Sequence, residues 1–204
     1  MDVLIKNGKI IDGTGNPWFY GDILLKDGRI SQIGRLIKAE KAEVVDASNL
    51  VVAPGFVNPH DHTDGIVFFQ SEMQPWITQG ITTSMCGNCS FSPFPDKDTW
   101  IEHTRTNPEV ELVTYSEKVR EFPHSWSSLT EYAHEVNRNT VGINIVPLIG
   151  HGTIRWKVGI RKDETPTEKQ RQKIMDLTRE GMEQGAYGLS LGLSDRAPKP
   201  MQRP

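Results

Sequence analysis

Two histidines two positions apart, His60 and His62, are the residues of this sequence best suited to chemistry. An apolar run that begins at Val51 and contains Pro54-Gly55 leads into them. Side chains two apart on a β-strand point to the same face, so we expect both imidazoles on one face and Asp61 pointing away. Two imidazoles on one face can bind one divalent metal ion. An isolated pair is more often two surface histidines, but the apolar lead-in favours a metal site.

The two cysteines, Cys86 and Cys89, follow the next apolar run, residues 81–85. Their C-x-x-C spacing occurs in redox pairs and in zinc knuckles, but this chain has no second pair and no thioredoxin-like context. A structural disulfide is not expected, and nothing indicates an oxidising compartment. We interpret Cys86 as a small buried residue at the end of a strand.

The composition is that of a globular protein. The chain has 204 residues, a formal net charge of −3 and 36% hydrophobic residues. Lysine and arginine are scattered, so no nucleic-acid partner is expected. The sequence contains no signal-like segment and no apolar run of membrane-spanning length, so we expect no membrane partner and a cytoplasmic location.

Residues 1–53 predict a small β module. Asn7-Gly8 and Asp27-Gly28 each separate two short apolar runs, the strongest short signal for a β-hairpin. Two further apolar runs follow at 42–45 and 50–52. Together they predict a small antiparallel sheet that is too small to hold a deep core alone.

From residue 54 to 193 short apolar strands alternate with helical segments, the pattern of βα units around a parallel sheet. The expected strands are the one running into His60 and those at 81–85, 141–148 and 186–191. The expected helices lie around 72–79, after Ser128, and after Thr165, which has the spacing of an N-cap with Glu168. Residues 194–204 contain three prolines and no period, and predict a disordered or aberrant tail.

Residues 90–124 carry several prolines, many charges and no sustained period. They predict a long, mobile cover over the end of the fold where a barrel site would form. We expect His103, His124 and His134, in this segment or on the following helix, to be surface residues.

Several separate motifs resemble the N-acyl-D-amino-acid deacylases (D-aminoacylases) of the amidohydrolase superfamily. They occur in family order over nearly all of residues 1–193: DVLIKNG, PGFVNPHDH, GNCSFS, GHGTIR and GAYGLS. The resemblance implies a small antiparallel β-sandwich and a metal-dependent (β/α)₈ barrel. It also implies zinc, as one or two ions, and hydrolysis of a linear N-acyl C–N bond in a small N-acyl amino acid by metal-activated water.

The same resemblance assigns residues. His60, His62 and Cys89 match metal ligands of the family, and a thiolate is a good zinc ligand. His151 and Arg155 follow the third expected strand, on the face where barrel active sites form. Arg155 would either hold a substrate carboxylate through a forked pair of hydrogen bonds or fix the loop structurally.

The sequence also departs from the family. A (β/α)₈ barrel alone takes about 250 residues, and only four barrel strands are expected here. In the family two further histidine ligands and the aspartate general base come from later strands, so they would lie beyond residue 204. We therefore expect a truncated chain, inactive alone, that needs its missing C-terminal half or self-association.

Two alternatives stay open at this point. One is a hydantoinase-like or dihydroorotase-like cyclic-amide hydrolase, but those relatives commonly carry a carboxylated lysine on the fourth strand, and residues 188–192 contain no lysine. The other is a non-catalytic half-barrel that binds metal and associates with a partner.

Overall fold

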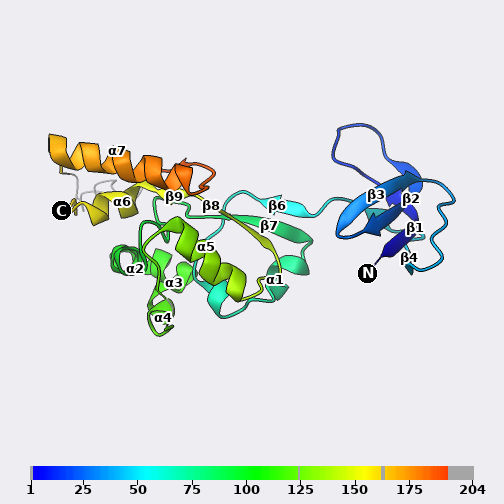
Figure 1. Cartoon of the computed structure of the whole chain (residues 1–204), viewed down its shortest axis with the longest axis horizontal. Coiled ribbons are helices and arrows are strands. Elements are labelled where there is room, and N and C mark those ends of the chain that lie inside the picture. The colour runs from blue at the N-terminus through cyan, green and yellow to red at the C-terminus, as the bar shows by residue number, and fades with distance from the viewer. Residues whose placement is uncertain (1, 124, 162–163, 193–204) are drawn as a thin grey trace, which may run out of the picture. The chain divides into compact units, whose positions relative to one another are not determined.

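The computed structural model describes residues 2–123, 125–161 and 164–192. The chain divides into two compact units, Met1–Gly55 and Phe56–Pro204. The first is a β-sheet and the second is mixed α/β, and Figure 1 labels the elements of each. The tail predicted at 194–204 and His124 lie outside the described residues.

The first unit contains a single five-stranded sheet. Its strands are β1 (Val3–Ile10), β2 (Phe19–Lys26), β3 (Arg29–Gly34), β4 (Glu43–Asp46) and β5 (Val51–Val52). The order is β3-β2-β1-β4, and β5 also pairs with β1. The prediction of a wholly antiparallel module is wrong, because β4 and β5 both pair parallel with β1. The connection after β3 passes to the edge of β1 that β2 does not occupy, and β4 and β5 then run in the same direction as β1.

One of the two expected hairpins is present. Asp27 and Gly28 join β2 to β3 and both have positive φ, 50° and 72°, as tight hairpin turns require. Asn7 also has positive φ, but it lies inside β1, where the pairing with β2 shifts register between Ile5 and Gly8. The hairpin predicted at Asn7-Gly8 is therefore wrong, because the left-handed backbone of Asn7 forms a β-bulge.

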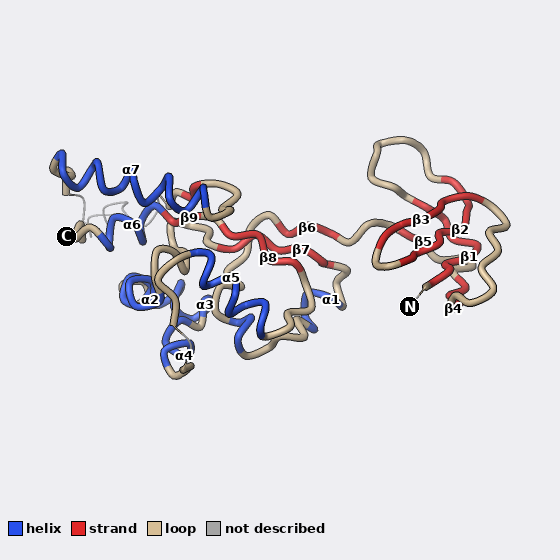
Figure 2. The backbone as a smooth tube through the Cα atoms, in the orientation of Figure 1, coloured by secondary structure: helices blue, strands red, loops and turns tan. Residues whose placement is uncertain are grey.

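The second unit is built from parallel strands. They are β6 (Phe56–Asn58), β7 (Ile81–Cys86), β8 (Asn144–Pro147), β9 (Ile149–Gly150) and β10 (Leu189–Ser190). The pairs β6-β7, β7-β8 and β9-β10 are all parallel. Figure 2 shows the helical segments that lie between these strands along the chain. Strands are confirmed in the expected regions 81–85, 141–148 and 186–191. They form two sheets, β6-β7-β8 and β9-β10, and each parallel pair joins strands that are neighbours in the chain, as in βα units.

Helical segments connect the strands. They are a short 3₁₀ helix, η1 (Ile66–Phe68), and α1 (Gln74–Ile77), α2 (Lys97–Thr104), α3 (Pro108–Thr114), α4 (Ser116–Arg120), α5 (Leu129–Arg138), α6 (His151–Lys157) and α7 (Glu168–Glu183). The predicted N-cap of α5, Ser128, is confirmed. The cap of α7 is Thr167, not Thr165. Thr167 forms a capping box with Gln170, so reciprocal side-chain bonds satisfy the first turn two residues later than predicted.

Residues 90–124 are not the irregular excursion predicted from sequence. They contain α2, α3 and α4, with Asp96 and Asn107 as N-caps of the first two. These helices have only five to eight residues each, so none is long enough to display a clear apolar period. Trp100, Ile101 and Val119 are fully buried in the core of the second unit. The helices α2 and α4 therefore contribute to the hydrophobic core.

The core of the second unit gathers side chains from η1, α2, α4, α5, α6 and α7. Leu129, Tyr132 and Val136 are the buried residues of α5. Phe68 stacks on Trp126, with ring centroids 5.6 Å apart. No helix in the described ranges is long and apolar enough to cross a membrane.

Candidate metal centre

The two histidines lie in the loop directly after β6. The strand ends at Asn58 because Pro59 has no N–H to donate, and the Asn58 side chain instead accepts a hydrogen bond from the His60 N–H at 3.2 Å. The prediction that His60 and His62 project from the strand itself is therefore wrong. The loop nevertheless runs beside the end of β7, because the Asp61 N–H donates to the Met85 carbonyl at 3.1 Å.

Cys89 lies in the turn that follows β7. Asn88, just before it, donates from its side-chain amide to the carbonyls of Asp61 at 3.1 Å and Met85 at 2.9 Å. Gly87 has φ 81°, and a Cβ at this position would lie 2.4 Å from the Leu148 carbonyl oxygen. The Gly-Asn-Cys turn therefore requires glycine, and Asn88 ties the cysteine turn to the histidine loop.

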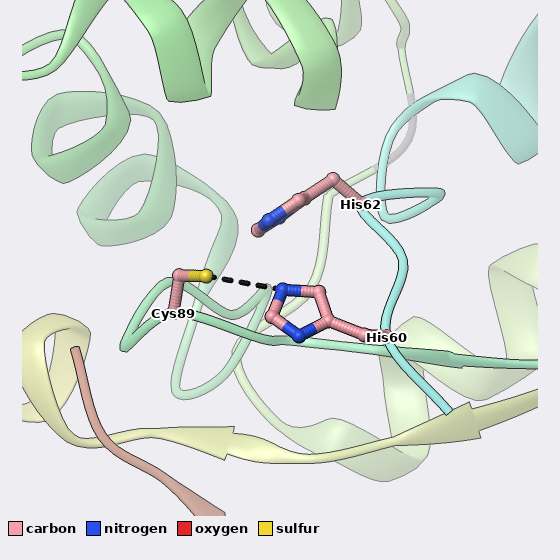
Figure 3. A group of neighbouring side chains, drawn as sticks. All are labelled: His60, His62 and Cys89. Atoms are coloured by element: carbon pink, nitrogen blue, oxygen red, sulfur yellow. Dashed lines mark hydrogen bonds between the residues drawn. The ribbon is translucent and has the colours of Figure 1, made fainter. Parts of the chain in front are cut away.

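The three candidate ligands converge. Figure 3 shows the rings of His60 and His62 turned towards the Cys89 side chain. One ligand atom from each residue lies within 4.8 Å of the other two, and His60 Nε2 is 3.2 Å from Cys89 Sγ. Tetrahedral zinc with nitrogen and thiolate ligands places those atoms roughly 3.3 to 3.7 Å apart. Two imidazoles and one thiolate in this arrangement fit a zinc ion after small side-chain rotations.

The carboxylate of Asp64 lies close by in sequence but outside this three-residue group. Asp64 is fully buried, and burial raises its pKa to about 7, although the backbone amides of Asp64 and Gly87 partly oppose the shift. Burial also raises the pKa of the neighbouring Cys86 thiol well above its usual value. Cys86 is completely buried at the end of β7 and is a free thiol, which confirms the prediction of a small buried residue.

His151 and Arg155 lie on α6, outside the three-residue group. The end of β9, directly before His151, is held to the chain after Cys89, because the Gly150 N–H donates to Ser92 Oγ at 2.8 Å. Arg155 is buried, and its Nη2 donates to the Glu164 carbonyl at 3.1 Å. Of the two roles left open for Arg155, this contact supports the structural one.

Two other histidines had been expected at the surface. His134 on α5 is exposed, as predicted. His103 is buried, so that prediction is wrong: its ring stacks on Phe91 at a centroid distance of 4.3 Å, and its Nδ1 lies 3.0 Å from Thr153 Oγ1. Phe91 and Thr153 are both distant from His103 in the sequence, so no local signal marks His103 as a core residue.

A cleft of about 420 Å³ opens beside the histidines. It is lined by His60, Asp61, His62, Ile66, Trp76, Leu112, Val113 and Tyr115. Leu112 and Val113 come from α3, so the segment that sequence patterns assigned to a mobile cover supplies one wall. The cleft therefore joins polar, ligand-bearing loops to exposed apolar side chains.

Comparison with known proteins decides the family. The protein-family model described as "Amidohydrolase family" matches residues 43–201 of the chain. The chain belongs to the amidohydrolase family. The resemblance inferred from the sequence motifs is thereby confirmed.

Several relatives of this amidohydrolase-family chain are deacylases by name. It is 31% identical to an N-acyl-D-aspartate deacylase of Alcaligenes xylosoxydans xylosoxydans over 94% of this chain and 36% of that protein. The N-acyl-D-glutamate deacylase of Bordetella bronchiseptica, solved with zinc and a phosphonate inhibitor, is 30% identical with a TM-score of 0.79, covering 95% of this chain and 38% of that one. A D-aminoacylase with a binuclear metal centre is 27% identical with a TM-score of 0.80, covering 93% and 38%. The chain thus spans little more than a third of these relatives.

Proposed function

We propose that His60, His62 and Cys89 bind zinc in a hydrolase that cleaves the linear amide C–N bond of N-acyl amino acids. The observation that carries the proposal is the convergence of two imidazoles and one thiolate from neighbouring strand ends. A bound zinc ion acidifies water and polarises an amide carbonyl. The relatives named above, one of which was solved with zinc, support the metal and the substrate class.

The chain's own residues would hold and orient the reactants. Asn88 keeps the Cys89 turn against the histidine loop. The cleft beside His60 and His62 has room for the acyl amino acid, with Leu112 and Val113 as an apolar wall. A second ion is part of the proposal, because the D-aminoacylase relative has a binuclear centre. The further ligands and the general base would come from a part corresponding to the stretch of the relatives that this chain does not span.

Completion of the site is also a proposal. The parallel strands β6 to β10 would form the first half of a (β/α)₈ barrel, and the five-stranded sheet would form part of a sandwich. Exposed apolar residues at strand positions, such as Phe56, Val57 and Leu189, support an additional partner surface. We propose that the missing C-terminal half or a second copy covers them, and that the isolated chain has no appreciable deacylase activity. The cytoplasmic location expected from the sequence stays a prediction.

Hydrolysis of N-acetyl-D-amino acids with added zinc tests this function. The purified chain should be inactive as a monomer and gain activity only when a polypeptide carrying the rest of the barrel is supplied. N-acetyl-L-amino acids and a cyclic amide such as a hydantoin serve as comparison substrates. A monodisperse monomer that hydrolyses the D-substrates would overturn the need for a partner, and turnover of the cyclic amide alone would favour the hydantoinase-like alternative.

A further inference from the structure

The residue between the two histidines has an unusually complete set of hydrogen bonds. Oδ2 of Asp61 accepts from Asn58 Nδ2 at 2.9 Å, Trp76 Nε1 at 2.5 Å and Ser84 Oγ at 2.7 Å. Oδ1 accepts from the backbone N–H of His62 at 2.8 Å. The two carboxylate oxygens thus accept four hydrogen bonds from side-chain and backbone donors.

The donors come from three different elements. Asn58 ends β6, Trp76 lies on α1, and Ser84 is a fully buried residue of β7. The Asp61 side chain therefore joins the start of the histidine loop to the helix that follows it and to the neighbouring strand. A loop held at one point in this way loses rotational freedom before any ligand binds.

The main chain of Asp61 extends this control to both sides of the metal site. Its N–H donates to the Met85 carbonyl, and its carbonyl accepts from Asn88, the residue before Cys89. Its side chain fixes the N–H of His62. Asp61 is not one of the three converging residues, yet it contacts the immediate neighbour or backbone of two of them.

We propose that Asp61 is the positioning residue of the metal centre. It acts through other residues: its carboxylate sets the path of the histidine loop, and through Asn88 the same residue holds the Cys89 turn in register with it. The inference rests on the proposed zinc site. Partners that orient metal ligands typically change metal affinity about 10- to 100-fold when they are removed.

Asp61→Asn is the most direct test because it keeps size and shape. Whichever way the amide is turned, its NH₂ group replaces one acceptor oxygen and faces a backbone or indole N–H. We expect zinc affinity, measured on the full chain by competition with a chelator, to fall about 10- to 100-fold. The urea midpoint of unfolding, measured in parallel without metal, records how far the lost hydrogen bonds lower stability. A merely structural role would lower this midpoint and leave the zinc affinity intact.

The matched control is Asp46→Asn in the first unit. The Asp46 carboxylate also accepts several bonds, from Asn7 Nδ2 at 3.0 Å and from the N–H and Oγ of Ser48 at 3.1 and 2.7 Å. This variant should bind zinc like the wild type. Should Asp61→Asn not fold, Trp76→Phe removes one donor and keeps an aromatic ring, and it should weaken zinc binding in the same direction.

The outcomes separate the two proposals. A wild-type chain that binds no zinc removes the proposed function and this inference with it. A wild-type chain that binds zinc, together with a folded Asp61→Asn or Trp76→Phe variant of unchanged affinity, overturns the positioning role alone.

Discussion

Replacing Gly87 with alanine tests whether the turn that presents Cys89 is set by close backbone contact. Gly87 has φ 81°, and a residue with a Cβ pays about 1–2 kcal/mol in that left-handed conformation. The new Cβ would also lie 2.4 Å from the Leu148 carbonyl oxygen and 3.2 Å from Ser92 Cβ. Leu148 cannot retreat easily, because its own N–H donates to the Cys86 carbonyl at 2.9 Å.

The clash therefore adds to the conformational cost. Overpacking of this kind costs about 1–3 kcal/mol, so Gly87→Ala should lower the free energy of unfolding of the second unit by roughly 2–5 kcal/mol in total. Gly159→Ala is the matched control: Gly159 has φ 87°, and its Cβ would meet nothing within 4 Å. That variant should lose only the conformational part, about 1–2 kcal/mol.

Urea unfolding followed by tryptophan fluorescence measures both variants. Trp76, Trp100, Trp126 and Trp156 all lie in the second unit, so the signal reports mainly on that part of the chain. Gly87→Ala should also bind zinc more weakly, because the turn carrying Cys89 must shift, whereas Gly159→Ala should not. Equal losses of stability in the two variants would refute the close-contact explanation.

Further predictions concern the two cores. Asp22→Ala should cost the first unit about 2–4 kcal/mol near neutral pH, because the carboxylate accepts from two backbone N–H groups. The hydrogen bond from the Asn7 N–H is the main cause that lowers the pKa of Asp22 in the folded state. This stabilisation is therefore present above about pH 4, the pKa of an unfolded aspartate, and is lost as the pH falls through the lower folded pKa. Urea unfolding at pH 7 and at pH 3 measures the difference. Trp100→Ala should cost about 3–5 kcal/mol; a loss below about 1 kcal/mol in urea unfolding would mean that residues 90–124 are the loosely held cover first expected. His103→Phe should lower the thermal midpoint yet leave zinc content unchanged, and a loss of zinc on elemental analysis would contradict its assignment as a core residue.

Local patterns predicted several elements of the second unit. The βα alternation, the strand at 81–85 and the cap at Ser128 depend on neighbours in sequence, and all are present. The wrong hairpin prediction in the first unit has a tertiary cause. The N–H of Asn7 donates to the carboxylate of Asp22, fifteen residues away. This tertiary contact stabilises a bulge where the Asn-Gly sequence predicted a hairpin turn.

The candidate site was predictable in part for the same reason. His60, His62 and Cys89 were marked by residue type, spacing and family motifs, and the structure brings them together. Asp61 was expected only to point away from the histidines. Its donors on α1 and β7 are 15 and 23 residues distant, so its contacts depend on how the elements pack and leave no local signature.

Zinc stoichiometry of the purified chain tests the central claim most directly. Wild type, His60→Ala/His62→Ala, Cys89→Ala and the exposed-histidine control His134→Ala would be loaded with zinc, exchanged into metal-free buffer and analysed for zinc per chain. The zinc site proposed here predicts bound zinc in the wild type and in His134→Ala, and its loss from both ligand variants. Equal zinc content in the wild type and the double histidine variant would contradict it.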